Sequence, residues 1–187
     1  MLGGVRRPPL IAVLVLALAV LVARRIDAPA PPADAGGRVA AGPGTVLEVL
    51  DGDTLVVRMA GYEGPVRIVG VDTPEIRHGD EPAACFGPEA ATATAAWLTG
   101  RPVVVRPARE QRDRYGRLLA YVAGVDGPLA GRDLARALAL SGLARALPIA
   151  PNLDDAPAID ERVARARLMR RGLWAACGEA RAFPGRG

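Results

Sequence analysis

The sequence contains no lysine: all 24 basic residues among its 187 are arginines. Schiff-base chemistry and phosphate-binding loops that depend on lysine are therefore excluded. With one histidine and two cysteines, the chain cannot form a multi-histidine metal site, a four-cysteine zinc site or a fold held by many disulfides. Aromatic residues make up 4%, so a nucleic-acid site cannot rest on a broad aromatic platform.

The positive charge of the chain is concentrated at its N-terminus. The formal net charge is +4, but the first 39 residues hold five arginines against two aspartates. The remaining residues therefore carry a net charge of about +1, which is weak support for DNA binding by global basicity. Any attraction for nucleic acid must come from the local placement of arginine.

Residues 1–27 have the pattern of a signal peptide or an uncleaved signal anchor. Two arginines precede the uncharged apolar run 10–23, which is short for a membrane span, and two more arginines follow it directly. Residues 28–43 are rich in Pro, Ala and Gly, which is typical of a linker and disfavours a buried core helix before it. We therefore expect a protein that is secreted, or anchored at the membrane with its domain outside the cytoplasm.

Residues 44–178 are predicted to form the folded domain, followed by a tail at 179–187. Short runs rich in β-branched residues, separated by turn residues, predict strands, and longer segments with apolar spacing predict helices. The strands are expected at 45–50, 54–59, 65–71, 103–106 and 118–123, and three helices at 88–98, 132–140 and 159–171. This order favours an α+β domain with an OB-fold-like, partly open five-stranded β-barrel.

Four clusters of charged and turn-forming residues interrupt this pattern. They are Asp-Gly-Asp-Thr at 51–54, Arg67 with Val-Asp-Thr-Pro-Glu at 71–75, Gly-Pro-Glu-Ala at 87–90, and Asp-Arg-Tyr-Gly-Arg at 113–117. Each alone is typical of a turn, a strand surface or a helix start. In this order, followed by Gly-Leu-Ala at 142–144 and Gly-Leu-Trp at 172–174, they resemble the staphylococcal-nuclease-like (thermonuclease) family over residues 44–177.

The resemblance implies a calcium site. Asp53 and Asp72 would supply carboxylates to Ca²⁺ and Thr73 its backbone carbonyl, which are oxygen ligands of the kind that this hard cation takes. Glu75 would act as the general base, or at least orient the water that attacks phosphorus. Asp51 is expected to shape the turn and support the metal site rather than to bind the metal directly.

The resemblance also implies a phosphate-binding site on arginine. Arg67 and Arg117 would clamp the phosphate, because a planar guanidinium matches two phosphate oxygens and keeps its proton at any working pH. Tyr115 and Arg114 are expected to contact the substrate. By the same resemblance, the protein would be a calcium-dependent endonuclease that cuts DNA, with RNA as a further substrate, and leaves 3′-phosphates. We expect it to be a monomer.

Two features depart from the family pattern. Family members commonly carry tyrosines shortly after the Gly-Leu-Ala motif, where this chain has Arg-Ala-Leu-Pro-Ile-Ala at 145–150. Base or sugar packing there should be weaker or rearranged. The loop after Glu75 carries Asp80 and Glu81, where a lysine-rich loop is familiar, and this should lower nonspecific attraction for DNA.

The state of the two cysteines has two possible outcomes. Export would favour a disulfide between Cys85 and Cys177, and the alternative is two buried free thiols.

The function could instead be that of a noncatalytic nucleic-acid-binding or protein-binding module on the same fold. A third hypothesis is a tethered envelope protein with a vestigial site.

Overall fold

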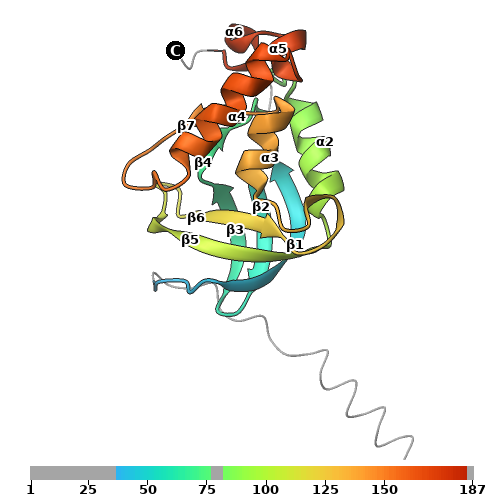
Figure 1. Cartoon of the computed structure of the whole chain (residues 1–187). Coiled ribbons are helices and arrows are strands. Elements are labelled where there is room, and N and C mark those ends of the chain that lie inside the picture. Colours follow the sequence, from blue (N-terminus) through green and yellow to red (C-terminus); the bar gives the residue numbers. More distant parts are fainter. Residues whose placement is uncertain (1–36, 77–81, 185–187) are drawn as a thin grey trace, which may run out of the picture. The chain divides into compact units, whose positions relative to one another are not determined.

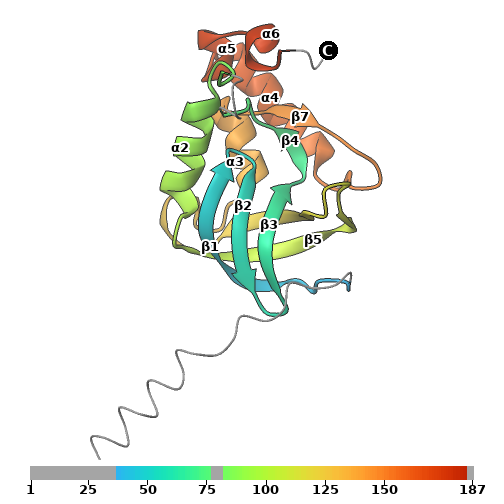
Figure 2. The same cartoon turned by 180° about the vertical axis from the view of Figure 1, so that it is seen from behind.

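The structure is a computed structural model that describes residues 37–76 and 82–184. Five strands form a barrel in the order β1-β2-β3-β6-β5 (Figures 1 and 2). They are β1 (Gly42–Asp51), β2 (Thr54–Met59), β3 (Tyr62–Ile68), β5 (Pro102–Arg112) and β6 (Leu118–Gly124). The predicted α+β, OB-fold-like class is confirmed. The barrel is closed rather than partly open, because β1 pairs with β5 and β3 pairs in parallel with β6.

The barrel interior is filled by aliphatic side chains that alternate along the strands. On β2, Leu55 and Val57 are fully buried while Arg58 is exposed, as expected for a strand with one face on the core. Val105 on β5 and Val122 on β6 pair across the ladder and are also fully buried. This alternation is a local property of the sequence, which is why the barrel strands could be predicted.

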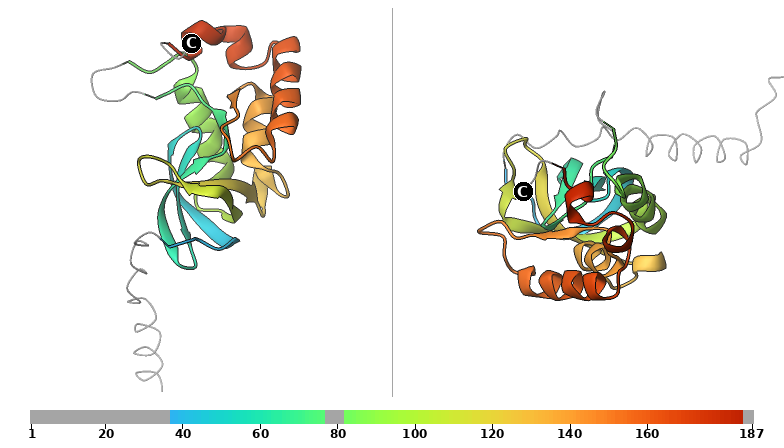
Figure 3. Two further views of the ribbon diagram at one scale, coloured as in Figure 1. Left: turned by 90° about the vertical axis from the view of Figure 1, so that its left-hand side faces the viewer. Right: turned by 90° about the horizontal axis from the view of Figure 1, so that it is seen from above.

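Three longer helices lie in the described part of the chain: α2 (Gly87–Leu98), α3 (Leu134–Ser141) and α4 (Ala156–Leu168). Helix α2 packs on β1 and α3 on β6, while α4 packs on α3. Shorter helical segments are η1 (Gly127–Leu129), α5 (Leu173–Ala176) and α6 (Glu179–Ala182). Figures 1 and 3 show α4, α5 and α6 gathered toward the end of the barrel from which β4 (Gly70–Asp72) emerges. Helix α3 starts two residues later than the predicted 132 because Asp133 caps it, accepting a 3.0 Å hydrogen bond from the backbone N–H of Arg136.

The predicted strand 65–71 is two strands. Strand β3 ends at Ile68, and β4 (Gly70–Asp72) leaves the barrel to pair with β7 (Arg145–Leu147) in a separate two-stranded sheet. Gly70 makes the bend, since its φ of 86° is unfavourable for other residues and a Cβ there would lie 2.5 Å from Ile159 Cδ1. The register of this small sheet places Asp72 opposite Arg145.

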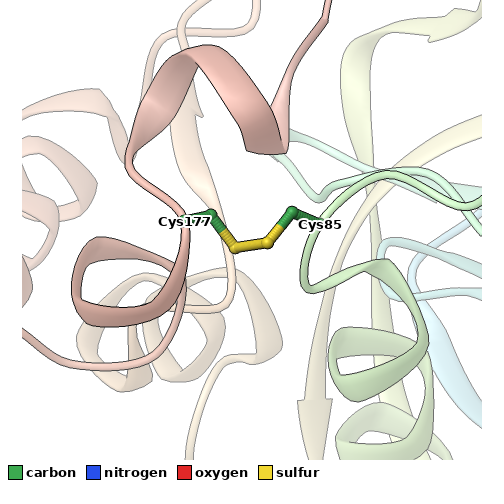
Figure 4. The surroundings of a disulfide bond; sticks show 2 residues. All are labelled: Cys85 and Cys177. Carbon is green, nitrogen blue, oxygen red and sulfur yellow. A yellow bond between two sulfur atoms is a disulfide. The ribbon is translucent and has the colours of Figure 1, made fainter.

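The C-terminal segment is tied to the start of α2. Cys85 and Cys177 form the predicted disulfide, with a Cα–Cα distance of 6.0 Å (Figure 4). Beside it, Leu173, Ala182 and Phe183 form a small buried cluster. The packed region therefore extends to Phe183, beyond the predicted domain boundary at 178.

Reduction of this disulfide should lower thermal stability. The bond spans 92 residues, and constraining a loop of that length in the unfolded chain is worth about 4–5 kcal/mol before any strain is subtracted. The unfolding midpoint should fall by on the order of 10 °C. Thermal unfolding with and without reductant measures this, and a C85S/C177S variant should not respond to reductant. An unchanged midpoint in the reduced wild-type protein would contradict the expectation.

Within the described ranges, no helix is long and apolar enough to cross a bilayer. The predicted signal or anchor segment, and the loop residues Asp80 and Glu81, lie outside those ranges.

Candidate active site

A cavity of about 700 Å³ opens where the β1–β2 turn, the β3–β4 bend, the β5–β6 loop and β7 meet. Most of the predicted site residues line it: Asp53, Arg67, Asp72, Glu75, Arg114, Tyr115 and Arg117. Thr73 is buried next to it and does not line the wall. The topology thus brings together residues that are spread over three segments of the sequence.

The turn that carries Asp53 is packed into the protein rather than exposed like an ordinary hairpin. The hydroxyl of Thr94 on α2 donates a 2.8 Å hydrogen bond to the carbonyl oxygen of Gly52, and a Cβ at Gly52 would lie 2.9 Å from the Thr73 side chain. Asp53 Oδ2 accepts a 2.8 Å hydrogen bond from the backbone N–H of Thr73. These contacts fix the Asp53 carboxylate against the segment that carries Asp72.

Arg67 lies between the two aspartates. One terminal nitrogen is 3.1 Å from Asp53 Oδ2 and the other is 3.3 Å from Asp72 Oδ1. The same side chain donates to the carbonyl oxygens of Ile68 and Val71, at 2.8 and 2.9 Å. In this structure the guanidinium therefore joins the two carboxylates and the β3–β4 bend, and its predicted role on the phosphate stays a prediction.

Burial in the site disfavours the charged forms of two of its aspartates. Burial raises the pKa of Asp51 to about 8, helped by the charge of Asp53 and a hydrogen bond with Glu75. Burial also raises the pKa of Asp53, although Arg67 opposes the shift. Asp51, Asp53 and Asp72 are each less than a tenth exposed. Ionising both Asp51 and Asp53 without a further cation is therefore unfavourable.

The raised pKa of Asp51 predicts an unusual pH dependence of the protein's stability when no cation is added. Between the ordinary carboxyl pKa of 3.8 and the raised pKa of about 8, the native protein holds a proton on Asp51 that the unfolded chain has lost. The unfolding free energy should therefore fall as pH rises through this window, with a contribution from Asp51 of at most about 1.4 kcal/mol per pH unit. Denaturant unfolding in chelator should show a flatter profile for D51N than for wild type. Parallel profiles would contradict the assignment.

The β5–β6 loop is organised by Asp113. Although burial opposes it, hydrogen bonds from the Arg117 side chain and from the backbone N–H groups of Arg117 and Tyr115 lower the pKa of Asp113. The Arg117 Nε is 2.7 Å from Asp113 Oδ2, which orients this arginine at the cavity wall. The sequence motif alone assigns no role to Asp113, although its spacing of four residues from Arg117 fits this ion pair.

Tyr115 and Arg114 form the outer part of the same loop. The Tyr115 side chain is 67% exposed, and the Arg114 guanidinium lies 4.7 Å from the centre of its ring. Both line the cavity, and both could contact a substrate without rearrangement of the barrel.

Comparison with known proteins identifies the family of this chain. The profile of the family described as "Staphylococcal nuclease homologue" matches residues 65–176. The chain belongs to this family. It is 35% identical over 130 residues to a thermonuclease of Staphylococcus hyicus, covering 69% of this chain and 73% of that protein. It is 32% identical over 162 residues to a thermonuclease of Staphylococcus intermedius, covering 87% of this chain and 94% of that protein. It is 30% identical over 131 residues to an uncharacterized endonuclease of Escherichia coli O157:H7, covering 70% of this chain and 76% of that protein.

Without the tyrosines that family members commonly carry after the Gly-Leu-Ala motif, one wall of the cavity is formed by Leu147, Ile149 and Asn152. Asn152 is buried, and its amide exchanges hydrogen bonds of 3.0 and 3.1 Å with the backbone of Glu110. This side of the cavity is therefore built from aliphatic groups and a structural amide, which can pack against a sugar or base but offer no aromatic ring.

The residues present fit a single hard cation. No group of three or more His, Cys, Asp or Glu side chains suited to a metal is found within 37–76 and 82–184. Ca²⁺ prefers oxygen ligands. These would be the carboxylates of Asp53 and Asp72, which Arg67 joins, together with the backbone carbonyl of Thr73 and water. Burial raises the pKa of Asp51 and of Asp53, and a bound cation would favour the charged forms of both carboxyls.

Proposed function

We propose that this chain is a calcium-dependent nuclease that hydrolyses phosphodiester bonds of DNA, and also of RNA, outside the cytoplasm. The observation that carries the proposal is the convergence of Asp53, Asp72, Glu75 and Arg117 on one cavity. The family supports a nuclease, since its thermonuclease and endonuclease relatives span most of the folded domain.

Each charged residue has a distinct part in this proposal. Asp53 and Asp72, with the backbone carbonyl of Thr73, would hold the cation. When bound, the cation would polarise a phosphate oxygen and neutralise part of its charge. Glu75, which lines the cavity, would accept the proton of the attacking water or orient that water toward phosphorus.

The arginines and the tyrosine would bind the phosphodiester. Arg117, oriented by Asp113, would donate hydrogen bonds to phosphate oxygens, and such donors are most effective on the more highly charged transition state. Arg67 would join it by shifting part of its hydrogen bonding from the carboxylates. Tyr115 and Arg114 would contact neighbouring nucleotides. As the family resemblance implies, the bond to the 5′ oxygen would break and leave a 3′-phosphate.

One assay tests the proposal and separates it from the alternatives. Single-stranded DNA and RNA should be degraded in calcium and remain intact in chelator, and phosphatase treatment should remove phosphate from the new 3′ ends. A protein that retains nucleic acid but does not cut it under either condition would be a binding module. The intact mass of the exported protein tests the secreted or anchored location, and its mass in solution tests the monomer.

A further inference from the structure

Arg145 holds the second oxygen of the Asp72 carboxylate. Its Nε lies 3.1 Å from Asp72 Oδ2, while Arg67 lies 3.3 Å from Oδ1. The two partners face each other directly in the β4–β7 register. The side chains of Arg145 and Asp72 are 16% and 4% exposed, so this ion pair is poorly screened by solvent.

The Arg145 side chain also contacts the C-terminal segment. The guanidinium lies 4.3 Å from the centre of the Phe183 ring, and Phe183 is buried with Leu173 and Ala182. That segment is fastened to the start of α2 by the Cys85–Cys177 disulfide. Phe183 therefore restricts Arg145 to positions close to Asp72.

We propose that Arg145 is a positioning residue that sets the cation affinity of the site, and that the C-terminal segment acts on the site through it. The inference rests on the proposed calcium site. A cation bound to Asp72 must share that carboxylate with a guanidinium 3.1 Å from one of its oxygens, and two like charges on one buried group repel each other. Arg145 thus compensates the charge of Asp72 without the cation and weakens binding of the cation.

Calorimetric titration of calcium into the full chain, without nucleic acid, tests this. The R145Q variant should bind calcium about three- to tenfold more tightly than wild type, because a neutral side chain no longer opposes the cation. The R145K variant keeps the charge and should stay near the wild-type affinity. A matched control is R167Q, since Arg167 also stacks on an aromatic ring, that of Trp174 at 4.3 Å, and pairs with an acid, Glu179.

A second variant tests the link to the C-terminal segment. The F183L variant keeps an apolar side chain but loses the ring that restricts Arg145, so calcium binding should tighten by less than in R145Q. The same substitution should have no effect on calcium affinity in an R145Q background. This double-mutant comparison distinguishes an action through Arg145 from a general loosening of the fold.

The outcomes separate the inference from the proposed function. If the wild-type protein takes up no calcium, the proposed calcium site fails and the inference with it. If wild type binds calcium and R145Q binds it equally or more weakly, the inference alone is overturned. If R145Q does not fold, F183L decides, with R167Q as the control for a general loosening: tighter binding in F183L than in R167Q supports the role of Arg145, and unchanged binding in F183L refutes it.

Discussion

Replacing Glu75 with glutamine should lower kcat by a factor of about 10²–10⁴ at saturating calcium, the range expected for loss of a general base. Glutamine keeps the size and hydrogen-bonding capacity of glutamate but cannot accept a proton from the attacking water. Glu75 lines the cavity and hydrogen-bonds with Asp51, so the change is made within the proposed site. Single-turnover cleavage of a short DNA strand measures the effect on the chemical step.

The matched control for this variant is E110Q. Glu110 lines the same cavity, but its backbone rather than its side chain is fixed by Asn152. Its replacement should change kcat little while removing the same charge. If E75Q altered KM and left kcat intact, Glu75 would be a docking residue, and the role as base or water-orienting group would have to be abandoned.

The D53N variant is expected to lose calcium-dependent cleavage while the domain stays folded. Asp53 is one of two carboxylates available to the proposed cation, and an amide is a weaker ligand without charge. Its neutralisation should also remove an unfavourable buried charge, because burial raises the pKa of Asp53. The unfolding midpoint in chelator should therefore not fall. Cleavage rate as a function of calcium concentration, together with thermal unfolding in chelator, gives both measurements.

A suitable control for D53N is E63Q. Glu63 is on β3 and pairs with Arg58 at the barrel surface, outside the cavity lining. The control should leave calcium dependence unchanged. Wild-type activity of D53N at limiting calcium would show that Asp53 is not a cation ligand, whatever the effect on stability.

Much of the barrel and part of the site were predictable because their signals are local. Alternation along β2 depends on residues two positions apart, and the hydrogen bonds of the Asp113–Arg117 turn stay within five residues. The family motifs predicted which charged residues would line the cavity. Strand β7 was not predicted, because three residues are too few to show a period.

Local residue patterns are enough to predict the strands of the barrel and the charged motifs. Which of the charged side chains meet depends on how the chain folds. Arg145 is 73 residues from Asp72, and the β4–β7 pairing brings them together. Phe183 was predicted to belong to a tail, and it is buried because the segment beyond Cys177 folds back over the start of α2. Such contacts depend on pairing between distant segments, which residue spacing along the chain does not encode.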